Sequence, residues 1–217
     1  MTSAQKNQAA DAEIPLHRTA TFQRYFPIKR LFDVCIASVG LLFAALPMLL
    51  IAVAVRADSS GSAVFRQKRI GRNGKPFTCY KFRTMKKSAP GSIATGALED
   101  ADAYITKTGR FLRKTSLDEL PQLWNILKGD MSLIGPRPLI PEETQVHEGR
   151  LRAGVYALRP GLTGYAQING RDLVSAEEKV RMDTQYLQNF SLKTDVEILF
   201  KTVFNVLSEK DIHEGLI

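Results

Sequence analysis

The longest apolar stretch of the chain runs from Val34 to Val55, 22 residues without a charged side chain. A straight α-helix of that length would extend about 33 Å, enough to cross a hydrocarbon core of about 30 Å. The stretch begins too far from the N-terminus, and is too long, to be a secretory signal peptide. The pattern therefore predicts a helical membrane segment.

Pro47 divides this apolar stretch, and basic residues lie on both sides of it. A proline inside a helix removes one backbone hydrogen bond and clashes with the carbonyl four residues earlier. Cationic flanks prefer the cytoplasmic side, so a spanning helix would have to export one of the two basic groups. Two interpretations stay open from the pattern: an ordinary transmembrane helix with a tolerated proline, and a re-entrant helix-break-helix that keeps both flanks on one side.

The pattern outside this segment predicts one mixed α/β, mostly helical domain. Residues 1–28 are polar and lack periodicity, so we expect a flexible tail. Val64–Ile70 and Phe77–Met85 are rich in β-branched and aromatic residues and flank the turn sequence Gly-Arg-Asn-Gly, which predicts a β-hairpin. Residues 86–98 have the composition of a loop.

A helical pattern extends from Asp100 to Leu127, with interruptions expected at Gly109 and Ser116, and Gly129 supplies a stop. Two proline-rich turns follow, at 135–138 and 159–161.

The C-terminal part of the chain predicts two further helices. Ser175 to Glu178 forms a capping box that opens a helix reaching about Phe190. A last helix, from about Lys193 to Ser208, has a broad apolar face. It either packs on the core or lies in the lipid interface, and packing on the core is the more frequent outcome.

The 217 residues carry a net charge of +8 and only two cysteines, Cys35 and Cys79. This length fits one domain, or one domain plus an anchor. A disulfide scaffold, a zinc site of Cys/His spacing and disorder of the whole chain are excluded. The basic balance leaves a nucleic-acid binder, a membrane-surface protein, an enzyme for anionic substrates, or a combination of these.

Several common catalytic motifs are absent. The chain has no GxxxxGK[ST], GxGxxG, HExxH or GxSxG motif, so P-loop, Rossmann, zincin and hydrolase-elbow sites have no support. Its three histidines are scattered, which disfavours a nucleophile activated by histidine.

The sequence Ser116-Leu-Asp118-Glu119 is the most suggestive local pattern. It has the form of a capping box, and the first turn of a helix attracts acidic residues in any case. The two carboxylates can also be interpreted chemically. Adjacent carboxylates on a helix project about 100° apart, so each is suited to a different role. One could attack a phosphorus atom while the other holds a divalent cation.

A phosphate-handling site also needs cations, and six are available near turns. Arg137 and Arg159 lie beside prolines that fix the local backbone, which prepares a guanidinium for bidentate contact with phosphate oxygens. Any single arginine is more often a solvated surface charge. The hypothesis of a phosphate-handling site therefore rests on the whole set of cations. The candidates are Lys81, Arg83, Arg113, Arg137, Arg159 and Arg171.

The order of these motifs from Lys29 to about Leu207 resembles the bacterial sugar transferases, the monotopic phosphoglycosyl transferases. The matching pieces are KRLFD at 29–33, the apolar segment with its central proline, YKFRTM at 80–85, LRKTSLDELPQLWNILKGDMSLIGPRP at 112–138, RPGLTGYAQINGR at 159–171 and D-x-x-Y-x-x-N-x-S at 183–191.

The resemblance implies an enzyme that moves a sugar-1-phosphate from a UDP-sugar to undecaprenyl phosphate and releases UMP, at the start of polysaccharide or glycoconjugate assembly. By the same resemblance Asp118 is the nucleophile, forming a covalent phosphosugar intermediate, and Glu119 helps to hold Mg²⁺. Arg113, Arg137 and Arg159 match phosphate-binding positions, and we count Lys81 and Arg83 with them.

The family's membrane element is a re-entrant helix broken at a proline, which matches Pro47 and favours that interpretation here. We therefore expect an enzyme at the cytoplasmic face of a bacterial inner membrane, in contact with membrane lipid. The expected regions are a tail at 1–28, the re-entrant helix at 29–56, a cytoplasmic catalytic domain at 57–208 and a C-terminal tail at 209–217.

Two departures and two rival functions accompany this prediction. Many relatives carry Ser before the proline, where this chain has Leu46, and many have additional N-terminal membrane helices. A non-catalytic membrane-anchored scaffold would keep the fold without needing Asp118 and Glu119. A nucleic-acid binder would need a recognition helix or an RNP pattern, and neither occurs. The sugar, the glycan pathway, the role of the tail and the oligomeric state, a homodimer included, are left open.

Overall fold

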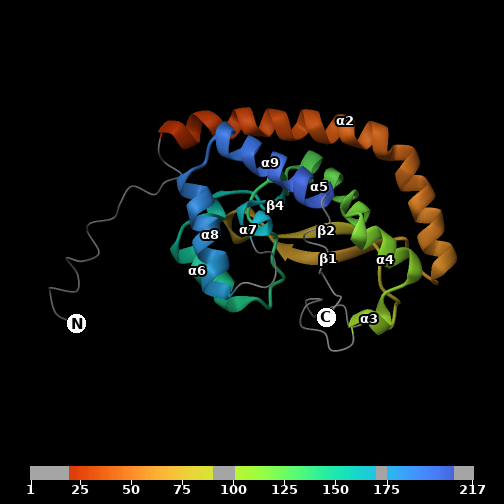
Figure 1. Ribbon diagram of the computed structural model, residues 1–217. Helices are drawn as coiled ribbons and strands as arrows, with labels where there is room; N and C mark the ends of the chain where they lie inside the picture. The colour runs from red at the N-terminus through yellow and green to blue at the C-terminus, as the bar shows by residue number, and fades with distance from the viewer. Residues whose placement is uncertain (1–19, 90–100, 170–174, 208–217) are drawn as a thin grey trace.

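The computed structural model describes residues 20–89, 101–169 and 175–207. Its longest element is helix α2, Ala20–Asp58, which contains both Pro27 and Pro47. The helix continues through Pro47, and its axis bends in its second half (Figure 1). The predicted helix-break-helix is therefore corrected to one bent helix, because a proline removes a single hydrogen bond and the following turns keep theirs.

Helix α2 also begins earlier than expected. Residues 20–28, assigned to the tail from their polarity, form its first turns, and residues 1–19 lie outside the described residues. Phe22 and Tyr25 in these turns are buried against Phe190, with ring centroids 4.8 and 5.0 Å from it. Aromatic packing against the segment between α8 and α9 therefore accompanies the extension of α2 beyond the apolar stretch.

The predicted hairpin is confirmed. Strands β1, Val64–Ile70, and β2, Pro76–Phe82, pair antiparallel, with Val64 opposite Phe82 and Ile70 opposite Pro76. A short 3₁₀ turn, η2, Arg72–Gly74, joins them, and Asn73 takes a left-handed conformation with φ of 58°. The second strand ends three residues before the expected Met85.

The helical region that follows contains α3, Ala101–Tyr104, α4, Lys107–Lys114, the 3₁₀ turn η4, Leu117–Glu119, and α5, Gln122–Lys128. Gly129 ends α5 with φ of 91°, as predicted. Gly109 lies inside α4 and does not interrupt it. A Cβ at this position would lie 2.0 Å from the carbonyl oxygen of Thr84, so glycine allows the close approach of the two backbones.

A parallel pair of short strands organises the second half of the chain. Strands β3, Ser132–Ile134, and β4, Gly161–Thr163, pair with Ser132 opposite Gly161, and the sequence analysis did not predict them. Between and after them lie α6, Thr144–Arg152, the 3₁₀ turn η5, Val155–Ala157, and α7, Tyr165–Ile168. Helix α8, Ala176–Gln188, begins at Ser175, whose side chain accepts a hydrogen bond from the Glu178 amide as predicted.

One face of α2 is packed on the rest of the protein along its whole length, with α5 and α9, Leu192–Leu207, beside it (Figure 1). Three buried clusters follow one another along α2. Its residues in these clusters are Phe22 and Tyr25, then Ala37, then Val55.

The opposite face of α2 is exposed and apolar, with Leu42 76% and Phe43 78% exposed. The segment Phe22–Asp58 is long and apolar enough to cross a membrane, and only 6% of its most apolar part is buried within the protein. Helix α9 buries Ile198 in the core, as expected, and also exposes apolar side chains such as Phe200. These exposed surfaces make membrane association the physical consequence of the fold.

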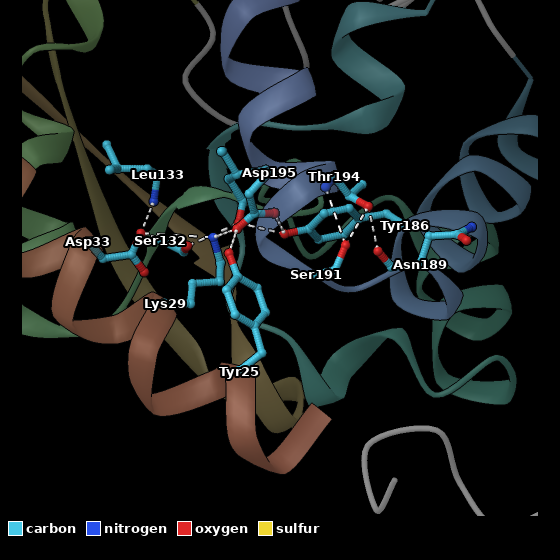
Figure 2. A network of polar contacts seen from close by, with 11 residues as sticks. Tyr25, Lys29, Asp33, Ser132, Leu133, Tyr186, Asn189, Ser191, Thr194 and Asp195 are labelled. Atoms are coloured by element: carbon cyan, nitrogen blue, oxygen red, sulfur yellow. Dashed lines mark hydrogen bonds and ion pairs between the residues drawn. The ribbon is translucent and has the colours of Figure 1, made fainter. Parts of the chain in front are cut away.

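A buried polar network joins α2 to the C-terminal helices (Figure 2). The Asp195 carboxylate accepts hydrogen bonds from Lys29 Nζ, Tyr25 Oη and Tyr186 Oη, each at 2.6 Å. One turn further along α2, Asp33 accepts hydrogen bonds from the Ser132 hydroxyl and from a backbone amide of β3. Charged residues of the membrane helix are therefore neutralised inside the protein.

We expect Asp195→Asn to lower the free energy of unfolding by about 3–5 kcal/mol, because it leaves the buried Lys29 ammonium without its carboxylate. Tyr186→Phe removes one hydrogen bond to the same carboxylate and should cost about 1.5–3 kcal/mol. Urea unfolding in detergent, followed by tryptophan fluorescence, measures both. A loss for Asp195→Asn no larger than that for Tyr186→Phe would contradict the role assigned to the ion pair.

Candidate active site

A small cavity that opens to solvent lies beside the β-hairpin, and three cations and two amides are among its lining residues. The hairpin contributes Arg69, Cys79 and Lys81. These three residues lie on one face because side chains alternate along a strand and residues opposite one another in a pair share a face. The remaining polar lining residues are Glu119, Gln122, Arg137 and Gln167.

The turn η4 carries the two candidate carboxylates. Ser116, just before the turn, has φ of 55° and makes no capping hydrogen bond with its side chain, so the capping-box interpretation is wrong. A left-handed serine at this point is a strained conformation of the kind found at functional sites. Asp118 is buried, at 9% exposed, and Glu119 Oε1 accepts a hydrogen bond from Lys81 Nζ at 2.6 Å.

Asn125 fixes η4 and α5 against the hairpin. This residue is completely buried, donates a hydrogen bond to the Thr78 carbonyl at 2.7 Å and accepts one from the Tyr80 amide at 3.1 Å. Both partners are in β2, on either side of Cys79. The amide of Asn125 therefore sets the spacing between Lys81 and Glu119, which come from elements distant in the sequence.

The loop that carries Arg137 is anchored from two directions. Gly135 and Gly161 approach so closely that a Cβ on Gly161 would lie 2.1 Å from the Gly135 nitrogen. Arg150 donates to the Arg137 carbonyl at 2.8 Å, and Arg150 is itself paired with the buried Asp183 at 2.6 Å. The Arg137 backbone is thereby held next to the hairpin.

The electrostatics of the cavity favour an anionic ligand. Burial lowers the pKa of Arg69, and the neighbouring Arg137 lowers it further. Guanidinium groups start from so high a pKa that both remain charged at neutral pH. Two arginines and Lys81 in one small cavity repel one another, and an anion such as a diphosphate would relieve this repulsion. Burial raises the pKa of the Cys79 thiol, which disfavours a thiolate nucleophile.

The structure brings Lys81, Glu119 and Arg137 together at the cavity, and Asp118 is buried on the same turn as Glu119 without lining the cavity. It does not bring the other predicted phosphate ligands there. The Arg83 guanidinium is buried at the end of α2 and donates to the carbonyls of Ser59 and Ser60, which satisfies helix-end acceptors.

Arg113 and Arg159 also lie outside the lining of the cavity. Arg113 donates to the Thr84 hydroxyl at 3.0 Å. Arg159 donates to the Gly129 carbonyl at 2.9 Å, and its guanidinium lies over the ring of Phe26. Arg171 is outside the described residues. Arg83 and Arg159 lie where buried carbonyl groups need hydrogen-bond donors. A sequence pattern does not reveal which carbonyl groups are buried without a donor.

The charged and amide lining residues that the sequence pattern did not predict are Arg69, Gln122 and Gln167. Alternation along β1 and β2 could have indicated Arg69, since it shares a face with Lys81. The two glutamines occur inside the matching motifs, but they carry no charge and were not considered as ligands.

Comparison with known proteins identifies the family of the chain. The sequence model described as "Bacterial sugar transferase" matches residues 23–209. The chain belongs to the bacterial sugar transferase family. The prediction made from its motifs is therefore confirmed, and the protein is a transferase.

Individual relatives cover most of this transferase. It is 44% identical to "Uncharacterized sugar transferase EpsL" of Bacillus subtilis (strain 168), over 86% of this chain and 91% of the relative. It is 41% identical to "Exopolysaccharide production protein ExoY" of Rhizobium meliloti (strain 1021), over 94% of this chain and 96% of the relative.

A longer relative is the "UDP-glucose:undecaprenyl-phosphate glucose-1-phosphate transferase" of Escherichia coli (strain K12), which is 38% identical over 88% of this chain. The match covers 42% of that relative's length.

Lysine substitutions of the two proline-flanked arginines should have different effects on the affinity for inorganic pyrophosphate. Isothermal titration calorimetry measures this affinity. Arg137→Lys keeps the charge but removes the planar fork at the cavity, so we expect about tenfold weaker binding. Arg159→Lys alters a contact outside the cavity, so it should change binding less and instead lower the free energy of unfolding by about 1 kcal/mol. Equal losses of binding in the two variants would contradict this assignment.

Proposed function

We propose that this transferase moves a sugar-1-phosphate from a UDP-sugar to undecaprenyl phosphate, releasing UMP, as the initiating step of polysaccharide or glycoconjugate assembly. The observation that carries the proposal is the cavity in which Lys81, Arg69 and Arg137 surround Glu119, next to Asp118. The names of the Escherichia coli and Rhizobium meliloti relatives support the donor, the acceptor and the exopolysaccharide product class.

In the first half-reaction the Asp118 carboxylate attacks the β-phosphorus of the UDP-sugar. A bond forms between a carboxylate oxygen and this phosphorus, while the bond from the phosphorus to the oxygen bridging the α-phosphate breaks. UMP leaves with that electron pair, and the sugar phosphate stays on Asp118 as an acyl phosphate. Burial of Asp118 removes most of the water from around the carboxylate.

In the second half-reaction a phosphate oxygen of undecaprenyl phosphate attacks the same phosphorus. The new phosphorus–oxygen bond forms as the bond to Asp118 breaks, which restores the carboxylate and yields a diphosphate-linked sugar on the lipid. The guanidinium groups of Arg69 and Arg137 hold phosphate oxygens in both halves, and Lys81 adds a third charge.

The carboxylates of this site fit Mg²⁺ when substrate phosphates complete its ligand set. No group of three or more metal-type side chains gathers in the part of the chain that the structure describes. Mg²⁺ commonly binds through one or two carboxylates together with phosphate oxygens and water, and Glu119 supplies one such carboxylate at the cavity. Glu119 would hold the ion, which when bound neutralises negative charge on the departing UMP.

Helix α2 supports a re-entrant placement at the cytoplasmic face of the bacterial inner membrane. Its first turns bury Phe22 and Tyr25 against the C-terminal helices, and its last turns bury Val55 against β2 and α4. A helix that crossed the bilayer would have its ends on opposite sides, separated by a hydrocarbon core of about 30 Å. Here both ends pack on one folded body, so they would lie on the same side, as the basic flanks also favour.

The sharpest test follows UMP release before any acceptor is added. With a UDP-sugar alone, the wild-type protein should release UMP in a burst and gain the mass of one phosphosugar. Asp118→Asn should reduce both signals by about 10³-fold or more, because an amide cannot act as this nucleophile. Glu119→Gln should instead slow the burst and raise the Mg²⁺ concentration that it requires.

Glu142→Gln, an exposed acidic position on another segment, serves as the matched control and should keep the wild-type burst. A direct-displacement enzyme would release UMP only after acceptor is added. A scaffold would release none with any UDP-sugar. Retained activity in Asp118→Asn would remove the proposed nucleophile.

The topology is tested by single cysteines in a background that carries Cys35→Ser and Cys79→Ala. Arg24→Cys and Ser62→Cys are exposed positions at the two ends of α2. In intact cells both should resist a membrane-impermeant maleimide, and both should react after permeabilisation. Reaction of Arg24→Cys alone in intact cells would establish a spanning helix.

A further inference from the structure

Two buried glutamines in the cavity have polar atoms without a partner. Gln122 is 2% exposed and Gln167 is 9% exposed. Among the described residues, four buried side-chain atoms lack a hydrogen-bond partner, and two of them are Gln122 Nε2 and Gln167 Oε1. Both residues line the cavity that contains Lys81, Glu119 and Arg137.

An unpartnered buried amide is unfavourable for folding, since such groups are nearly always hydrogen-bonded in proteins. Both glutamines lie on short elements that other contacts hold in place. Gln122 is the first residue of α5, which Asn125 clamps to the hairpin, and Gln167 lies in α7 between β4 and α8. The amides are therefore held in place toward a group that the unliganded protein lacks.

The chemistry of the two free atoms limits that group. Gln122 Nε2 is a donor and Gln167 Oε1 is an acceptor. An ionised phosphate offers only acceptors, so it would leave the Gln167 oxygen unsatisfied. A hydroxyl group both donates and accepts, so it can satisfy either atom.

A sugar matches these requirements better than the uracil base does. Each pyranose hydroxyl can donate to Gln167 and accept from Gln122. Uracil also has a donor and acceptors, but flat bases are commonly held by stacking on aromatic rings. The described lining of the cavity contains no aromatic side chain.

We infer that Gln122 and Gln167 form the subsite for hydroxyl groups of the sugar in the nucleotide-sugar donor, beside the cations that hold its diphosphate. This inference rests on the proposed function. It assigns sugar recognition to two neutral residues, and it leaves phosphate binding to Arg69, Arg137 and Lys81. The glutamines would act as specificity-determining residues, since a site built to hydrogen-bond a hydroxyl discriminates against ligands that lack it.

The test uses Gln122→Met and Gln167→Met, which keep the approximate size of the side chain and remove its amide. The matched control is Gln188→Met at an exposed position of α8. UDP-glucose and UDP-galactose are the donors, and kcat/KM is measured from UMP release with undecaprenyl phosphate present. We expect about tenfold or greater loss of kcat/KM in each cavity variant and none in the control.

Two further measurements separate recognition of the sugar from other roles. Stabilisation of the protein by UDP, read from the shift in Tm, should be unchanged in the cavity variants, while the additional shift given by UDP-glucose or UDP-galactose should disappear. The Tm of the unliganded variants should equal or exceed that of the wild type, because the substitution removes an unpartnered buried amide. Gln167→Glu keeps an acceptor oxygen and should retain more activity than Gln167→Met.

Each contrary result overturns the inference in a recognisable way. Unchanged kcat/KM in the Met variants would show that the glutamines do not contact the sugar. Equal weakening of the UDP and UDP-sugar shifts would assign them to the nucleotide. A lower Tm of the unliganded Met variants, or equal activity of Gln167→Glu and Gln167→Met, would make them structural. Absence of UMP from the wild type with every donor would instead refute the proposed function.

Discussion

The burial of Lys29 inside the protein is the interaction on which the arrangement of the other elements depends. Its ammonium group belongs to a largely apolar helix, and Lys29 is 8% exposed. Such a charge is tolerated only with a close carboxylate and further hydrogen bonds, which Asp195, Tyr25 and Tyr186 supply. Because Asp195 is in the first turn of α9 and Tyr186 is in α8, satisfying this one charge draws both C-terminal helices against α2.

The same helix supports the cavity through a short series of contacts. Arg30 donates to the carbonyls of Ile126 and Leu127 in the last turn of α5, and the Ile126 carbonyl also accepts a hydrogen bond from the Gly129 amide. Helix α5 is in turn fixed to β2 by Asn125, and β2 carries Lys81. The apolar helix and the cavity proposed to bind phosphate are thus built on adjoining elements. This proximity suits a reaction between a water-soluble donor and a lipid-linked acceptor.

The cavity and the adjoining turn η4 contain features that a protein selected only for stability would avoid. Ser116 is left-handed, Arg69 and Arg137 are close neighbours of like charge, and the amides of Gln122 and Gln167 each retain an unpartnered atom. Local violations of packing and hydrogen-bonding rules concentrate where ligands bind, because the ligand supplies the missing partner. Their coincidence with the carboxylate pair marks this cavity more strongly than any single residue does.

Local patterns in the sequence were enough to predict the apolar helix, the hairpin, the Gly129 stop and the Ser175 cap, since each depends on neighbours within a few residues. The motif order was enough for the family. The tertiary structure alone decided three other features. These are the parallel pairing of β3 with β4, the roles of Arg83 and Arg159, and the presence of Gln122 and Gln167 in the cavity. Each depends on a close backbone approach, a buried carbonyl or a cavity shared between segments that are far apart in the chain. A local sequence pattern contains no information about which distant segments come together.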